Sequence, residues 1–106
     1  MINKIRFTQE QLTKVARLSD EDMELIADCR GEHNKLGLGY QLCYIKLFNR
    51  FPTYNPFTVI DELASFVAIQ LDMSLEQLTR YADQKATFFR HQDAICTHLK
   101  IGRAHV

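Results

Sequence analysis

The chain has 106 residues, of which 46% are hydrophobic and 25% are charged, with only four glycines and two prolines. This size suits one domain with a continuous core and leaves no room for an enzyme with separate binding and catalytic lobes, and the composition excludes disordered, collagen-like and low-complexity classes. Thirteen basic residues balance thirteen acidic ones, so the net charge gives no argument for a nucleic-acid partner.

The three cysteines, Cys29, Cys43 and Cys96, are widely spaced and form no C-x-x-C pair. An odd number without paired spacing is typical of neither a disulfide framework nor a zinc ribbon, and it fits a reducing compartment. No apolar run approaches the roughly 18–20 residues that span a membrane, and the first residues lack the pattern of a signal peptide. We therefore expect a soluble, cytoplasmic protein with no membrane partner.

Two short helices are expected at the start of the chain. Thr8, followed three residues later by Gln11, has the form of a capping box and predicts a helix that begins after Thr8. Ser19 precedes the acids of residues 20–22, which the helix dipole favours in a first turn, and so predicts a second helix start. Gly31 fits the end of that second helix.

The segment 36–51 is the most apolar of the chain and is predicted to be a helix with Asn34 as its N-cap. A helix that is apolar nearly all round is normally the central helix of a bundle. Gly37 and Gly39 lie near its start, although a glycine costs roughly 1 kcal/mol against alanine inside a helix. They indicate either a close contact with another helix or a later helix start, and the sequence leaves both open.

Three further helices are expected after a proline-containing break. Asn55 as N-cap with Pro56 at the first helical position predicts a helix start. A capping box at Ser74 predicts the next helix, and a last helix is expected over residues 85–99 or 87–99. No stretch alternates with a period of two for long enough to predict a strand.

These elements predict an all-α fold over residues 1–100, a single compact domain of about five helices. Short connections and unequal helix lengths favour orthogonal packing over an up-and-down bundle, and they allow a helix-turn-helix-like arrangement. The residues expected to be buried and packed together in the core are Leu42, Ile45, Phe48, Ile60, Leu63 and Val67.

The chain contains no phosphate-binding loop, no dinucleotide fingerprint, no nucleophile elbow and no H-E-x-x-H zinc motif. His91 and His98 lie two helical turns apart with Cys96 nearby, but a metal site needs three or four converging ligands, so surface histidines are the better interpretation. Cys29 and Cys43 lie on apolar helix faces, which favours structural thiols over nucleophiles. We expect no catalytic residue, metal, cofactor or small-molecule substrate.

A polar stretch with Arg30, His33, Asn34 and Lys35 precedes the most apolar helix. Such side chains together can contact phosphates and base edges of DNA. The alternative is a polar loop in which Asn34 caps the helix and His33 packs behind it. The residues alone favour this architectural alternative.

The order of several motifs resembles the N-terminal region of the Tn-three family of bacterial transposases, the large enzymes of replicative transposons. The resemblance covers residues 8–99. The motifs that carry it are L-S-D-E-D at 18–22, H-N-K-L-G at 33–37, Q-L-C at 41–43, V-I-D-E-L-A at 59–64, L-T-R-Y-A at 78–82 and T-x-x-x-H-x-x-x-I at 87–95.

The resemblance implies a DNA-binding module that recognises the terminal inverted repeats of a transposon. Its implied partners are double-stranded DNA and the remainder of the transposase chain. The alternative is a helical protein–protein docking module without direct DNA contact. Because the family's catalytic DDE domain is absent from this chain, no enzymatic activity is expected. The candidate DNA-binding residues are Arg30, His33, Asn34, Lys35, Lys46, Arg50, Arg80, Lys85 and Arg90.

The chain also departs from the family pattern. Lys35 replaces an arginine, Phe88 stands where an arginine commonly follows the threonine, and Arg30 is alone where the family often has several arginines. Each change removes a potential DNA contact, so we expect weak DNA affinity. The tail, residues 101–106, departs from the family's usual continuation and matches one reading frame of a common sequencing adapter. We therefore expect a truncated fragment with a non-native or disordered end.

Overall fold

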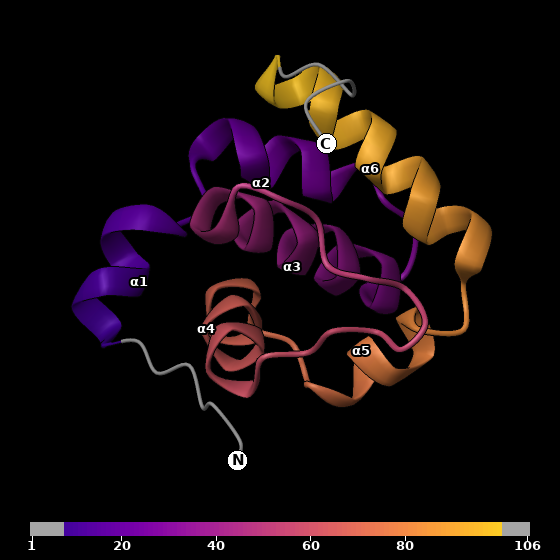
Figure 1. Cartoon of the computed structure of the whole chain (residues 1–106), viewed down its shortest axis with the longest axis horizontal. Coiled ribbons are helices and arrows are strands. Elements are labelled where there is room, and N and C mark those ends of the chain that lie inside the picture. Colours follow the sequence, from indigo (N-terminus) through magenta and orange to yellow (C-terminus); the bar gives the residue numbers. More distant parts are fainter. Residues whose placement is uncertain (1–7, 101–106) are drawn as a thin grey trace.

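Six helices occupy residues 8–100, the part of the chain that the computed structural model describes (Figure 1). Within this range there is no β-strand, only an isolated bridge between Tyr54 and Phe57. The all-α prediction is confirmed, with six helices in place of about five; the tail at 101–106 lies outside the described residues. The helices are α1 Gln9–Val15, α2 Asp20–Ala27, α3 Glu32–Phe48, α4 Asp61–Leu71, α5 Glu76–Tyr81 and α6 Lys85–Leu99.

The two predicted starts at the beginning of the chain are confirmed. The amide of Gln11 donates to the Thr8 hydroxyl (3.1 Å), and the amide of Thr8 donates to the Gln11 side chain (2.9 Å). Ser19 and Asp22 form the same reciprocal pair at the start of α2. Local side chains therefore satisfy the free amides of both helix starts.

The start of α3 differs from the prediction. Gly31, not Asn34, is the N-cap, and it does not end α2, which stops at Ala27. Gly31 has φ +82°, a left-handed conformation that glycine adopts without steric cost, so the chain can turn sharply into α3 at this point. Asn34 lies inside the first turn, where its side-chain amide donates to the Arg30 carbonyl (2.8 Å).

Helix α3 is the centre of the fold, and the other five helices in the described part of the chain all pack against it. Its residues 36–45 are buried without interruption. A Cβ atom at Gly37 would lie 2.2 Å from the Tyr81 ring of α5, and one at Gly39 would lie 3.0 Å from Leu71. The glycines therefore serve a close contact between helices, which decides between the two alternatives that the sequence left open.

The predicted helix start at Asn55–Pro56 is wrong. Residues 49–60 form a loop, and α4 begins at Asp61. The Tyr40 hydroxyl holds the end of this loop on α3, since it donates to the Thr58 carbonyl (2.8 Å) and accepts from the Ile60 amide (2.9 Å). A tertiary contact, which local capping signals do not report, thus sets where α4 begins.

Helices α5 and α6 are joined by the short turn 82–84. The Ser74 capping box is not formed: Leu75 is the N-cap of α5, and the Ser74 hydroxyl only accepts a 3.3 Å bond from the Glu76 amide. The prediction for the last helix is confirmed at Lys85–Leu99.

Leu42, Ile45, Leu63 and Val67 are buried as predicted, whereas Phe48 and Ile60 are only half-buried at the edge of the core. In Figure 1, α3 runs across the view while α4 is seen almost along its axis, so these two helices cross steeply. No helix in the described residues has the length and apolarity needed to cross a membrane.

Candidate nucleic-acid interface

Gln41, the first residue of the Q-L-C motif, is fully buried and ties α3 to α5 and α6. Its side-chain NH₂ donates to the Tyr81 hydroxyl (2.7 Å) and to the Phe88 carbonyl (3.0 Å), and its oxygen accepts from Gln92 (3.0 Å). All the hydrogen-bonding groups of the buried amide are used, so this residue stabilises the fold and is not available to DNA. In the sequence, the signal for this structural role is a glutamine on an otherwise apolar helix face.

His91 continues this network, and its interpretation as a surface histidine is wrong. It is buried, stacks on Tyr81 and has Nδ1 2.8 Å from the Tyr81 hydroxyl. Because that hydroxyl accepts from Gln41, it donates its own proton to Nδ1, which leaves the ring proton on Nε2 facing the Cys29 sulfur at 3.9 Å. Burial, with a smaller contribution from Arg90, lowers the pKa of His91 from 6.5 to about 4.

The lowered pKa of His91 predicts a pH dependence of stability. In the unfolded chain the imidazole binds a proton below about pH 6.5, whereas in the folded chain it stays neutral until about pH 4. The unfolded state therefore binds more protons between these values, and the free energy of unfolding should fall as the pH falls from 6.5 to 4. Urea titrations across this window should show that His91→Gln loses this component, while the matched control His33→Gln retains it.

A second buried polar cluster forms around Asp22 and ties α2, α3 and α6 together. The Asp22 carboxylate accepts hydrogen bonds from Lys46 and from His98 Nε2 (2.7 Å), and Lys46 also donates to the Arg17 carbonyl (3.1 Å). Lys46, a candidate DNA contact in the sequence, is thus engaged in an ion pair inside the protein.

Three of the candidate cations belong to the segments around the contact between Cys29 and His91: Arg30 follows Cys29, Arg90 precedes His91 on α6, and Lys35 lies in the first turn of α3. Arg30 and Arg90 are exposed, whereas Lys35 is half-buried. The Cys29 sulfur lies 3.9 Å from Nε2 of His91, the residue after Arg90, and the charges of Lys35 and Arg90 both act to lower the pKa of this thiol. We call Arg30, Lys35 and Arg90 the α3–α6 corner.

Acidic residues and a thiol also lie next to the cations of the α3–α6 corner. They limit its positive charge and its reactivity. Asp28 and Glu32 are exposed next to its cations, so its net positive charge is small. Burial, with Asp28, raises the pKa of Cys29 above its ordinary value despite the cations. The thiol therefore stays protonated, which does not suit a nucleophile.

Four further candidates are not part of the α3–α6 corner: His33, Arg80, Lys85 and Arg50. The His33 ring lies against Gly31, with Cε1 2.9 Å from where a Cβ atom would be, so it braces the turn. Arg80 and Lys85 are exposed near the turn between α5 and α6. Arg50 is exposed just beyond the other end of α3, whose last residue, Phe48, lies about 20 Å along the helix axis from Lys35 at 1.5 Å per residue.

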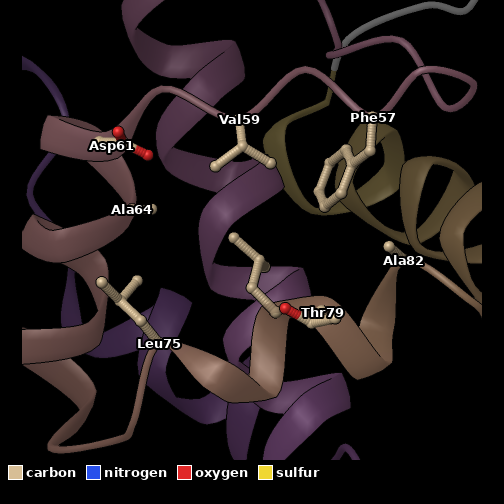
Figure 2. A pocket seen from close by; sticks show the side chains of 8 residues that line it. Phe57, Val59, Asp61, Ala64, Leu75, Thr79 and Ala82 are labelled. Carbon is tan, nitrogen blue, oxygen red and sulfur yellow. The ribbon is translucent and has the colours of Figure 1, made fainter.

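An apolar groove of about 320 Å³ lies between α5 and the loop that precedes α4. Figure 2 shows Phe57 and Val59 on the loop side of this groove, facing Leu75 and Thr79 on the α5 side, with Asp61 at its edge. Its chemistry suits an apolar side chain and not a phosphate.

The thiols and histidines do not build a metal centre in the described residues, where no three potential ligands come together. Cys43 is buried, donates to the Ala16 carbonyl (2.9 Å) and has its pKa raised to about 12 by burial. It joins α1 to α3 as a structural thiol, as its place on the apolar face of α3 predicts.

The chain is similar to known transposases over most of its length. A family model described as a domain of unknown function (DUF4158) matches residues 4–105. The transposase for transposon gamma-delta of Escherichia coli (strain K12) is 34% identical over 82 residues, which are 76% of this chain and 8% of that protein. The transposase for transposon Tn501 of Pseudomonas aeruginosa is 28% identical over 97 residues, 89% of this chain and 9% of the relative.

A third relative, the transposase for transposon Tn3926 of Escherichia coli, is 32% identical over 88 residues, 78% of this chain and 8% of the relative. The chain therefore spans less than a tenth of the length of these relatives. No solved structure matches it.

Proposed function

Because the chain belongs to the DUF4158 family and is a Tn-three-type transposase N-terminal domain, we propose that it binds double-stranded DNA at the terminal repeats of a transposon. The α3–α6 corner is the surface that binds. Transposition chemistry is not assigned to this chain, and its place in a transposase is that of a recognition module.

The observation that carries this proposal is a contrast among residues of the motifs that resemble the transposase family: some of these residues are buried and others are exposed. Gly37, Gln41 and His91 are committed to packing and to internal hydrogen bonds. The side chains of Arg30 and Lys35, from the same stretch, make no hydrogen bond or ion pair within residues 8–100 and reach the surface at least in part. Such cations are the side chains that contact phosphates.

The local geometry supports phosphate binding at the same place. The N-cap of α3 makes no side-chain hydrogen bond to the first amides of the helix, which carry the positive end of the helix dipole. Arg30 precedes the Gly31 turn and Lys35 lies in the first turn of the helix, so both cations belong to the segment that carries these amides. The alternative function, docking of another part of the transposase without DNA contact, would use the apolar groove.

Salt dependence separates the two functions. A binder that makes about three phosphate contacts should lose affinity with a log–log salt slope near −2.7, since each contact contributes about −0.9. We expect this slope when the intact chain is titrated with a terminal-repeat duplex of the gamma-delta transposon. Arg30→Ala and Lys35→Ala should each flatten the slope by about 0.9 and leave the melting temperature nearly unchanged.

The matched control is Lys14→Ala, which removes an exposed cation from α1, at the opposite side of the molecule in Figure 1. It should leave the slope unchanged. Absence of binding at low salt would contradict the proposal. Binding of a transposase fragment without salt dependence would favour the docking function instead.

A further inference from the structure

Helices α5 and α6 are joined by a short turn, as are the two helices of a helix-turn-helix unit. Residues 82–84 separate the short α5 from α6, and α6 has 15 residues, about 22 Å at 1.5 Å per residue. In such units the second helix enters the major groove, which is wide enough to admit it. In Figure 1, α6 lies along the outside of the molecule.

The two faces of α6 differ in the way that a groove-binding helix requires. Phe88, His91 and Ile95 fix the inner face in the core. The residues exposed on the outer face follow helical spacing: Ala86, Phe89, Arg90, Asp93 and Thr97. Asp93 is the single carboxylate among these residues, and Ala86 and Thr97 are the small uncharged ones.

Phe89 is a partly exposed aromatic residue whose neighbours along α6 include cations. Its side chain is 44% exposed, and it is the only aromatic residue among the exposed large hydrophobics of the described chain. Lys85 lies one turn before it and Arg90 follows it. The exposed ring is held in place by the rings of Tyr54 and Phe88, whose centroids lie 5.7 Å and 5.2 Å from its own.

The buried network fixes α6 at the level of these two residues. Gln41 accepts from Gln92 and donates to the Phe88 carbonyl, while His91 is bonded to the Tyr81 hydroxyl. The residues immediately before and after the Phe89–Arg90 pair are therefore anchored to α3 and α5. A rigid support of this kind sets the position of side chains that must discriminate between bases.

We propose that α6 is the recognition helix, with Phe89 packing on the 5-methyl group of a thymine and Arg90 donating to O6 and N7 of a guanine. These are the contacts by which an apolar ring and a guanidinium distinguish base pairs in the major groove. The inference rests on the proposed function, and it assigns Arg30 and Lys35 to phosphates that flank the groove.

Modified duplexes test the two contacts separately. The intact chain first selects a preferred duplex from a random-sequence library at low salt. Each thymine of that duplex is then replaced by deoxyuridine, which removes only the methyl group. At one thymine position we expect the deoxyuridine duplex to bind the wild type about fourfold more weakly than the unmodified duplex, which is the effect of one buried methyl group. Phe89→Ala should bind the two duplexes equally.

Arg90→Lys keeps the charge but loses the two-pronged hydrogen bond. We expect it to lose about tenfold or more in affinity for the selected duplex, and to become insensitive to 7-deazaguanine at the contacted guanine, with little change in the salt slope. Ile69→Ala, which trims an exposed apolar residue on α4, is the control and should keep both sensitivities. Thermal melting of every variant verifies that it is folded.

The outcomes distinguish this inference from the proposed function. Salt-dependent binding without any enriched sequence would overturn the recognition role of α6 and leave DNA binding standing. An enriched sequence whose deoxyuridine and 7-deazaguanine forms bind wild type and variants alike would also overturn it. Absence of binding to any duplex at low salt would refute the proposed function itself, and this inference with it.

Discussion

Replacing Leu42 or Leu63 by alanine is expected to lower the free energy of unfolding by about 2–5 kcal/mol. Both side chains are fully buried at the centre of the core, Leu42 on α3 and Leu63 on α4. Each substitution removes apolar contacts and leaves a cavity that the helices, which cross steeply, cannot close by a simple shift. The loss is a large share of the stability of a domain of this size.

Urea unfolding monitored by circular dichroism measures this loss, with Ile69→Ala as the matched control. Ile69 lies on α4 like Leu63 but is 75% exposed, so its truncation should change stability by less than about 0.5 kcal/mol. Equal effects of Leu63→Ala and Ile69→Ala would contradict the position of α4 in the fold.

Asp22→Asn is expected to destabilise the fold by about 3 kcal/mol, the low end of the range for breaking a buried ion pair, because the Lys46 ammonium still reaches water. The Asp22 side chain is 2% exposed and that of Lys46 is 20% exposed. The substitution removes the negative charge that both Lys46 and His98 face, and so weakens the connection of α2 to α3 and α6.

Asp20→Asn is the control, because Asp20 lies in the same first turn of α2 but is exposed. It should cost less than about 1 kcal/mol, the size of a helix-dipole contribution.

Burial raises the pKa of Asp22, but the hydrogen bonds from Lys46, the Ser19 amide and His98 outweigh burial and hold the pKa below its ordinary value of 3.8.

The lowered pKa of Asp22 means that its contribution is fully present above the unfolded value and is lost as the pH falls through the folded value. The difference in unfolding free energy between wild type and Asp22→Asn should therefore shrink in strong acid. A difference that stays constant down to acidic pH would contradict the ion pair.

Elements with local signals were predictable from the sequence. The capping boxes at Thr8 and Ser19 involve residues three apart, and the apolar run of α3 marks a central helix by itself. The extent of α6 also followed from spacing. In each case the interactions that decide the structure lie within one turn or one helix face.

The errors arose where distant residues decide the structure. The start of α4 depends on the Tyr40 hydroxyl, 18 residues before Thr58. The burial of His91 depends on Tyr81 and Gln41, which belong to two other helices. No pattern within the last helix reports these partners.

The same limit applies to the candidate site. Arg30 and Lys46 are both candidates from the sequence, but Arg30 is exposed in the structure whereas Lys46 lies in an ion pair with Asp22. The grouping of Lys35 with Arg90 around Cys29 joins residues 55 positions apart and needs the fold. Charge in a sequence therefore indicates candidate DNA contacts, and only the fold shows which of these cations are exposed and which lie in internal ion pairs.

Mapping of amide chemical shifts during a DNA titration tests whether the chain binds DNA through the α3–α6 corner. The intact chain, labelled with nitrogen-15, is titrated with a terminal-repeat duplex at low salt. We expect the shift changes to concentrate at residues 30–35 and on the outer face of α6 around Arg90, while the amides of Val59 and Leu75 in the groove stay unchanged. Shifts confined to the groove, or none at saturating DNA, would contradict it.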